Sequence, residues 1–319
     1  MPLPHGWHAW RPLAPELGPT ATHPVVAPLL ARCTFPAAGT EVTCAVSGGA
    51  DSTALLVLAV AAGCTATAVH VDHGLRAGSA NEAEVVRRLA ATLGVAFRSV
   101  TVHVGDGPNL EARARKARYD ALPSDVFTGH TADDQAETML VNLLRGAGRS
   151  GLSAMRPGPR RPILALRRTD TDMLCASFGL EVVHDPSNSD PRHLRNRVRH
   201  ELLPTMQQLA QRDLVPVLTR QADLARDESD LLDELAAALD PTDAKALAAA
   251  PTALARRAVR HWISGEHPPD AATVERVLAV ARGDATGTDL GGGRRVTRQH
   301  QRLFLNHLAQ PSASSDPNE

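Results

Sequence analysis

Short apolar runs alternate with longer amphipathic stretches between residues 41 and 145. Runs rich in β-branched and apolar residues predict buried strands, and longer stretches with an apolar face predict helices. The predicted order is strand 41–46, helix 52–62, strand 65–71, helix 80–93, strand 95–102, helix 109–121, strand 125–128 and helix 131–145. This alternation favours an α/β fold, an open parallel sheet with helices on both faces, Rossmann-like in form.

The pattern changes after residue 156. The segment 156–192 is rich in proline, arginine and aspartate, and an arginine-rich helix is predicted over 193–211. Ala- and Leu-rich helices are predicted over 214–283, and Gly291–Gly293 precede a predicted hairpin. We therefore expect an N-terminal extension (1–40), an α/β domain (41–212), a smaller, mainly helical C-terminal domain (213–310) and a disordered tail (311–319).

Composition narrows the class of protein. The chain has 319 residues, 43% of them hydrophobic, and a net charge of −1, so it is long enough for two domains and is not basic as a whole. Arginine is in excess between Arg145 and Arg212, and acidic residues are in excess from Asp213 to Ala250. This distribution suggests that one face of the protein binds a polyanion. Equally, the two stretches can be ordinary helical surfaces exposed to solvent.

The run from Ser52 to Val69 carries no charge and is nearly long enough to cross a membrane. Gly63 divides it into a helix and a β-branched stretch, which a buried helix followed by a buried parallel strand explains better. We expect no membrane span and no signal peptide. The cysteines are scattered without a C-x-x-C spacing, so no disulfide or zinc site is predicted, and a cytoplasmic protein is expected.

The run Ser47-Gly48-Gly49-Ala50-Asp51-Ser52 links the first predicted strand to the first helix. Glycines let the backbone approach a phosphate closely, and the free N–H groups of a first helical turn point at it. Ser47 and Ser52 add hydroxyl donors, and Asp51 places a carboxylate where a Mg²⁺ ion bridging phosphates would lie. The run predicts a nucleotide site; the alternative is a glycine-rich turn whose Ser and Asp cap the helix.

This run has no lysine, whereas a Walker A loop, G-x-x-x-x-G-K-[ST], requires one. The lysines of the chain are Lys116 and Lys245. The run resembles instead the PP-loop of ATP pyrophosphatases, S-G-G-x-D-S. The resemblance implies that ATP is cleaved between its α- and β-phosphates and that AMP passes to an acceptor oxygen.

Asp133, Asp134 and Glu137 crowd the start of the helix predicted over 131–145. Positions three or four apart share a helix face, and like charges there repel one another unless a cation is near. A helix N-terminus offsets part of the repulsion, so a well-capped helix is one interpretation. The other is a pocket for Mg²⁺ or a cationic substrate, in which one carboxylate can accept a proton. The position beyond a strand end, facing the nucleotide loop, favours the pocket.

Further blocks resemble, in the same order, those of the tRNA(Ile)-lysidine synthetases. They are Val71-Asp72-His73-Gly74-Leu75-Arg76; Leu110-Glu111 with Arg115 and Arg118-Tyr119; Gly129-His130 with Asp133 to Thr138; Arg145-Gly146, Gly148, Gly151-Leu152 and Met155; Arg161-Pro162; Asp185-Pro186-Ser187-Asn188; and Arg195-Asn196-Arg197-Val198-Arg199. The similarity covers residues 42–205. Thr131 is a departure, because the family usually has a second histidine there.

The resemblance implies ATP-dependent ligation of free L-lysine to C2 of the wobble cytidine in the CAU anticodon of tRNA(Ile), with AMP and diphosphate released. AMP transfer turns the C2 oxygen into a leaving group that an amine can displace. Asp134 and Glu137 would hold the lysine ammonium, and Arg195 and Arg199 would neutralise phosphates. The region 213–310 would recognise the tRNA, and a homodimer is compatible with the resemblance.

The residue roles implied by the resemblance fall into three groups. The catalytic residues are Asp51, Asp134, Glu137 and Arg199. The phosphate cradle is Ser47, Gly48, Gly49, Ala50, Asp51 and Ser52, with Mg²⁺ on Asp51. The substrate contacts are His130, Asp133, Arg115, Arg118 and Arg195. Two alternatives stay open: Arg115 and Arg118 can be helix-face ion pairs, and His130 can be a helix-cap partner.

Other functional classes make different demands on the sequence. A cytidine thiolase of the PP-loop group needs sulfur-handling cysteines or an iron–sulfur cluster, and Cys175 is the only cysteine in the second half of the chain. A glutamine-dependent amide synthetase needs a glutaminase domain, for which residues 1–40 are too few. A non-catalytic ATP-binding sensor needs neither the acidic trio nor the arginine block.

Overall fold

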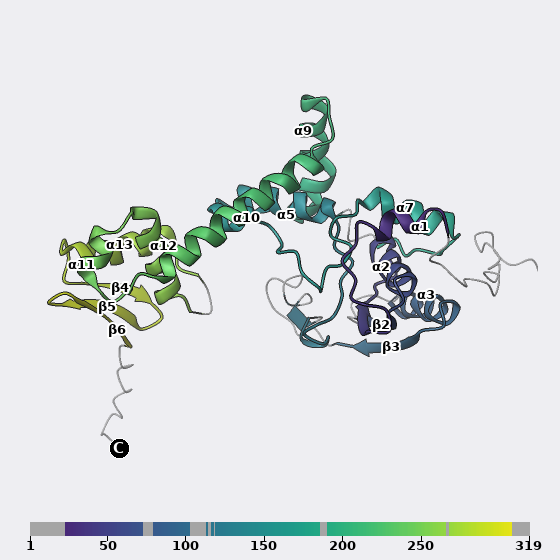
Figure 1. Cartoon of the computed structure of the whole chain (residues 1–319), viewed down its shortest axis with the longest axis horizontal. Coiled ribbons are helices and arrows are strands. Elements are labelled where there is room, and N and C mark those ends of the chain that lie inside the picture. Colours follow the sequence, from purple (N-terminus) through teal and green to yellow (C-terminus); the bar gives the residue numbers. More distant parts are fainter. Residues whose placement is uncertain are drawn as a thin grey trace, which may run out of the picture. The chain divides into compact units, whose positions relative to one another are not determined.

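The computed structural model describes residues 23–72, 79–102, 113, 116–117, 119–185, 190–265 and 268–307. By packing, the chain divides into a first unit, Met1–Asp223, and a second unit, Leu224–Glu319, each with its own hydrophobic core. The division falls inside the long helix α10 (Val215–Ala237) (Figure 1).

A three-stranded parallel sheet lies at the centre of the first unit. β1 (Glu41–Ala45) pairs with β2 (Thr65–Asp72), which pairs with β3 (Ala96–Thr101), so the order is β1-β2-β3. α2 (Ala50–Ala61) and α3 (Ser79–Thr92) connect these strands. The predicted α/β fold is confirmed, and every strand and helix predicted between residues 41 and 102 is present.

The strand predicted over 125–128 was wrong in extent. Phe127 forms an isolated parallel bridge with Cys44, held by two backbone hydrogen bonds to β1 of 2.8 and 2.9 Å. The N–H of Thr128 points away from β1, as that of every second residue in a strand does, and donates to the carbonyl of Arg160 at 2.9 Å. A strand continues only while its backbone groups meet the neighbouring strand, so pairing stops after one residue.

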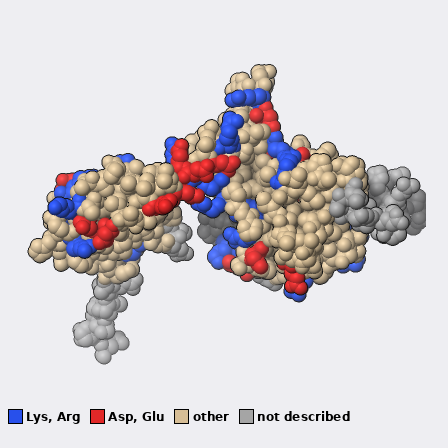
Figure 2. Space-filling view, viewed as in Figure 1, with Lys and Arg blue, Asp and Glu red and all other residues tan. Residues whose placement is uncertain are grey.

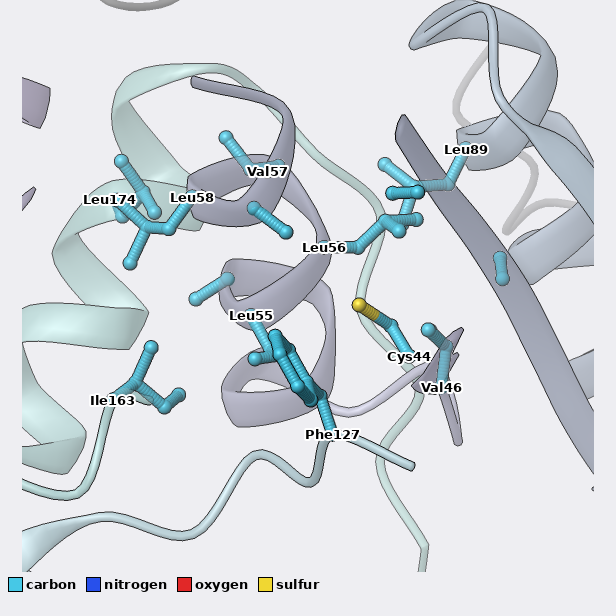
Figure 3. Close-up of a cluster of buried hydrophobic side chains, with 14 of the residues drawn as sticks. Cys44, Val46, Leu55, Leu56, Val57, Leu58, Leu89, Phe127, Ile163 and Leu174 are labelled. Carbon is cyan, nitrogen blue, oxygen red and sulfur yellow. The ribbon is translucent and has the colours of Figure 1, made fainter. Parts of the chain in front are cut away.

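The core of the first unit forms around α2, which is apolar on all sides. α1 (Val26–Leu30) and α7 (Arg168–Ser177) pack against it, and Leu174 of α7 belongs to the same buried cluster. Fully buried side chains of this cluster include Leu55, Leu56, Leu58, Ile163 and Leu174 (Figure 3). A helix that is hydrophobic all round belongs in a core, and this explains the uncharged run 52–69 as α2 followed by β2. No helix in the described parts of the chain has the length and apolarity needed to cross a membrane.

The opposite face of the sheet carries a smaller cluster of Val69, Leu122 and Val126. The helix predicted over 109–121 lies mostly outside the described residues, although residues 116–117 and 119–120 are helical.

The helices that follow carry the polar side chains of the site. They are α5 (Ala132–Leu144), α6 (Arg149–Leu152), α7, α8 (Leu194–Arg197) and α9 (Leu203–Ala210). The single α-helix predicted over 193–211 was wrong in one respect, because a π-helical turn, Val198–Leu202, separates α8 from α9. Pro204 lies in the first turn of α9 and has no backbone N–H, which favours a local change of hydrogen-bond pattern.

The second unit packs helices against an antiparallel sheet. Its elements are the second half of α10, α11 (Ala244–Ala249), α12 (Thr252–Ile263), α13 (Ala271–Arg282), β4 (Gly287–Gly291), β5 (Arg294–Gln299) and β6 (Arg302–His307). The hairpin predicted here is β5–β6, and β4 adds a third strand that the prediction lacked. Val259, Ile263 and Val277 are among its fully buried residues.

Candidate functional site

The loop 47–52 joins the end of β1 to the start of α2. Gly48 has a φ of +90°, a left-handed conformation that favours glycine, and its carbonyl accepts the N–H of Val183 at 2.9 Å. A Cβ at Gly48 would lie 2.7 Å from the side chain of Val183. Gly49 is the N-cap of α2 and has no side chain with which to cap it. The first N–H groups of α2 are therefore suited to binding an anion.

Two hydroxyl groups hold this loop together. The Oγ atoms of Ser47 and Ser52 lie 3.1 Å apart, and the Ser52 hydroxyl donates to the Gly49 carbonyl at 2.9 Å. Ser52 Oγ also accepts the N–H of Ser47 at 3.1 Å. Ser52 is buried whereas Ser47 is exposed, so Ser47 is the hydroxyl that a ligand can reach.

Asp51 lies in the first turn of α2 with its carboxylate 25% exposed. It accepts a hydrogen bond from the hydroxyl of Thr171 at 2.5 Å, and Arg168 Nε lies 3.5 Å away. Burial raises the pKa of Asp51 to about 6, although Thr171 and Arg168 act in the opposite direction. The carboxylate is therefore charged at neutral pH at a cost that a bound cation would reduce.

The start of α5 lies directly against the loop. A Cβ at Gly129 would lie 2.7 Å from the carbonyl oxygen of Asp51 and 2.9 Å from the nitrogen of Ser52, so the two backbones approach too closely for any other residue. Just beyond, the Thr131 N–H donates to Asp134 Oδ2 at 2.9 Å and caps α5. This approach brings the acidic turn of α5 to the nucleotide loop.

Three arginines surround the buried carboxylate of Glu137, which is 1% exposed. Its Oε1 accepts from Arg199 Nε at 2.6 Å and from Arg168 Nη1 at 3.2 Å. Its Oε2 accepts from Arg195 Nε at 2.9 Å and from Arg199 Nη2 at 3.1 Å. Each oxygen thus meets two charged donors, which is a dense arrangement for a group cut off from water.

The same arginines extend to the neighbouring carboxylates. Asp134 Oδ1 accepts from Arg195 Nη2 at 2.8 Å, and Arg168 Nη2 lies 3.5 Å from it. Through its Nε, Arg168 also reaches Asp51. We call this group the arginine–carboxylate network; its members are Asp51, Asp134, Glu137, Arg168, Arg195 and Arg199.

The network shifts the titration of its members. Burial opposes the charge of Asp134, but Arg195 and Arg168 outweigh it and hold the pKa of Asp134 below its ordinary value. Burial likewise opposes the charge of Arg168, and Glu137 and Asp134 outweigh it, so the pKa of Arg168 is raised. The lowered pKa favours the charged form of Asp134, which pairs with a cation.

Asp133 lies outside the network and joins the starts of two helices. Its Oδ2 accepts from Arg167 Nε at 3.0 Å and from the backbone N–H of Arg168 at 2.8 Å, and its Oδ1 accepts from Arg167 Nη2 at 3.2 Å. Arg167 also pairs with Asp213. These contacts fix α7 to α5, which supports a positioning role; its predicted substrate contact stays a prediction.

The structure brings together five residues predicted from the sequence, namely Asp51, Asp134, Glu137, Arg195 and Arg199. His130 lies beside this group, with its Nδ1 2.8 Å from the Thr128 hydroxyl. Arg115 and Arg118 lie outside the described residues. Arg168 and Thr171, both on α7, were missed, because neither belongs to a motif and their partners are more than thirty positions away in the sequence.

No group of three or more His, Cys, Asp or Glu side chains is placed to hold a metal ion among the residues that the structure describes. Asp51 can supply one oxygen ligand at the phosphate cradle. Mg²⁺ commonly takes one or two protein carboxylates and completes its shell with phosphate oxygens and water, so the donor set fits an ion that binds together with a nucleotide.

Comparison with known proteins identifies the family of the chain. A family model described as a PP-loop domain matches residues 25–206, and one described as a TilS substrate binding domain matches residues 243–304. The chain is 40% identical over 305 residues to the tRNA(Ile)-lysidine synthase of Nocardia farcinica, covering 88% of this chain and 96% of that protein. It is 39% identical to the tRNA(Ile)-lysidine synthase of Thermobifida fusca, covering 84% and 92%. It is also similar to a solved U34-tRNA thiolase from Methanococcus maripaludis, with a TM-score of 0.49 and 15% identity over 63% of this chain and 78% of that one.

Proposed function

Because the chain belongs to the tRNA(Ile)-lysidine synthase family, we propose that it uses ATP to join free L-lysine to C2 of the wobble cytidine of a CAU-anticodon tRNA(Ile). The observation that supports this most is the arginine–carboxylate network, which links the nucleotide loop to a buried acidic pair through one residue, Arg168. The reaction needs an anion site and a cation site side by side, and we assign these to the nucleotide loop and to the acidic pair.

The nucleotide would bind at the loop 47–52. Its phosphates would meet the first N–H groups of α2 and the Ser47 hydroxyl, and Asp51 would hold Mg²⁺. Transfer of AMP to the C2 oxygen of cytidine makes that oxygen part of a leaving group. Arg199 would offset the negative charge that accumulates on the phosphate.

Lysine would bind at Asp134 and Glu137. Their carboxylates are buried, and a buried carboxylate pairs strongly with an ammonium because little water competes. Arg195 donates a hydrogen bond to each of the two carboxylates and would orient them. When the amine attacks C2, one of the two carboxylates would accept its proton, and AMP would leave with the former C2 oxygen.

The tRNA would contact both parts of the chain, with residues 41–212 acting on the anticodon and residues 213–310 binding elsewhere, mainly through phosphates. Acidic side chains gather along α10, as Figure 2 shows, and would repel phosphates, so we place the tRNA on other surfaces. We further propose that the protein acts in the cytoplasm and that it can form a homodimer, which light scattering would test. No role is proposed for the extension 1–40.

The test is incorporation of labelled lysine into a CAU-anticodon tRNA(Ile) transcript, with a GAU-anticodon transcript as control. We expect release of diphosphate that needs both tRNA and ATP, followed by lysine in the CAU transcript alone. Absence of lysine from that transcript would refute the proposal even if ATP binds. Asp51→Ala should abolish diphosphate release, whereas Asp120→Ala, which removes an exposed carboxylate paired with Lys116, should not.

Glu137→Gln separates the two halves of the reaction. It should reduce lysine transfer more than diphosphate release, since Glu137 is assigned to the amine and not to the nucleotide. Equal loss of both steps would contradict the lysine site.

A thiolase is the rival that shares the PP-loop. Burial raises the pKa of Cys44 and of Cys175 to about 12, which disfavours the thiolate that sulfur transfer requires. Sulfur in the tRNA product, rather than lysine, would favour the rival.

A further inference from the structure

The arginine–carboxylate network is balanced in charge. It pairs three carboxylates, those of Asp51, Asp134 and Glu137, with three guanidinium groups, those of Arg168, Arg195 and Arg199. Adding charge to a cluster of this kind is unfavourable, because water is largely excluded and cannot compensate it. A lysine ammonium can therefore bind well at the acidic pair only when an arginine moves away.

Arg168 is the arginine that reaches both ends of the network. Its Nη1 donates to Glu137 at 3.2 Å and its Nη2 lies 3.5 Å from Asp134, while its Nε lies 3.5 Å from Asp51 in the nucleotide loop. Arg195 and Arg199 pair with Asp134 and Glu137, and the ion pairs of the described chain do not include either of them with Asp51. Among the three arginines of the network, Arg168 is thus the one that pairs with the nucleotide loop.

One nitrogen of Arg168 can donate further hydrogen bonds. Nη2 is buried and has no hydrogen-bond partner within the part of the chain that the structure describes. A buried donor without an acceptor is unfavourable by about 1–3 kcal/mol, so a new acceptor at this position would be stabilising. A phosphate oxygen is a fitting acceptor, since guanidinium and phosphate form short, charge-assisted hydrogen bonds.

Building on the proposed function, we propose that Arg168 is a positioning residue that makes lysine binding depend on the nucleotide. In the arrangement seen here, its guanidinium fills the cation position beside Asp134 and Glu137. Phosphates bound at the loop 47–52 attract the guanidinium toward them. Its departure leaves one negative charge of the network unbalanced, and one lysine ammonium restores the balance.

Isothermal titration of the full chain with L-lysine tests this coupling, with and without Mg²⁺ and α,β-methylene-ATP, an analogue that cannot be cleaved at the α–β bond. We expect the analogue to lower the Kd of the wild type for lysine by about tenfold to a hundredfold, the usual range of coupling between sites. In Arg168→Gln the two Kd values should agree to within about twofold, because the competing guanidinium is gone. Arg168→Lys, which keeps a charge but loses the fork, should retain part of the coupling.

Arg32→Gln is the matched control. Arg32 pairs with Asp170, also on α7, at 2.9 Å and is 43% exposed, so its loss removes a cation near α7 and leaves the network intact. This variant should keep the full coupling. Circular dichroism checks that each variant is folded, and if Arg168→Gln is not, Arg168→Lys decides: reduced coupling supports the inference and full coupling overturns it.

Three results would overturn the inference: equal lysine affinity of the wild type in both conditions, no lysine binding in either, or full coupling in Arg168→Gln. Lysine incorporation into tRNA separates this failure from failure of the proposed function. A wild type that incorporates lysine without coupled binding would refute only the role of Arg168, whereas a wild type that incorporates none would refute the proposed function itself.

Discussion

Glu137 holds three arginines together, and neutralising it tests how far the site depends on that one charge. Glu137→Gln keeps the shape of the side chain but replaces one carboxylate oxygen by an NH₂ group, a donor. That donor would face guanidinium groups that are donors only, so the hydrogen bonds accepted by the replaced oxygen, which lie in the range 2.6 to 3.2 Å, would be lost. The remaining positive charges would lie beside a neutral group that is 1% exposed.

The expected magnitude follows from burial. Removing one partner of a buried ion pair costs about 3–5 kcal/mol. The three arginines are 23–32% exposed, so water compensates part of the loss, and we expect about 3 kcal/mol in the free energy of unfolding. For a unit the size of Met1–Asp223, that corresponds to a fall of about 6–12 °C in Tm.

Differential scanning calorimetry of the full chain measures this change, with the transition of the first unit assigned by hydrogen exchange in α2. Glu181→Gln is the control, because Glu181 is 61% exposed and pairs with Arg88 at 2.6 Å on the surface. Exposed pairs contribute about 0–1 kcal/mol, so its Tm should stay within about 3 °C of the wild type. If Glu137→Gln also stays within that range, the carboxylate does not hold the arginines together as described.

Three further substitutions test other parts of the structure. Gly129→Ala should weaken nucleotide binding at least about tenfold in calorimetric titration, since its Cβ would lie 2.7 Å from the backbone of Asp51. Gly148→Ala is the control and should bind the nucleotide normally, because its Cβ would have no described atom within 4 Å. Equal affinities of the two variants would contradict the close approach of Gly129 to the loop. Asp51→Asn should raise Tm at pH 7.5 in EDTA but not at pH 4. The pKa of Asp51 in the folded protein, about 6, lies above the ordinary 3.8, so the free energy of unfolding of the wild type falls by up to about 3 kcal/mol as the pH rises through this range. A difference in Tm that does not depend on pH would contradict this. Arg257→Gln, which breaks the pair with Asp233, should lower the Tm of the second unit by about 4–8 °C and leave that of the first unchanged, and a shift in both would argue against independent units.

The parts of the fold that the sequence predicted are those set by local patterns. β1, α2, β2, α3 and β3 follow one another with the expected bounds because buried parallel strands appear in a sequence as apolar runs of β-branched residues. The loop 47–52 was identifiable for the same reason, since its glycines and first helical turn are neighbours in the chain. Position relative to a strand end was enough to place Asp134 and Glu137 near it.

The parts that the sequence did not predict depend on partners distant in the chain. Phe127 pairs with β1 for one residue only, and the N–H of Thr128 on the other edge donates to Arg160, a distant partner that no local pattern near residue 127 contains. Arg168 follows another arginine at the start of an ordinary helix, and its importance comes from the approach of α5 to α7. The carboxylates of Asp133 and Asp134 are adjacent in sequence yet serve different purposes, because successive helix positions point in different directions.

The hydrogen bond from the backbone of Arg168 to Asp133 limits how this arginine can respond to a ligand. Its main chain is anchored to α5, so only the torsions of the side chain are free to change. An exposed side chain exchanges rotamers in picoseconds to nanoseconds. Arg168 is 26% exposed and must first break its pairs with Asp51 and Glu137, but it needs no hinged domain motion. Admission of the amine would then require the exchange of ion pairs at a single side chain, while the scaffold of α5 and α7 stays as it is.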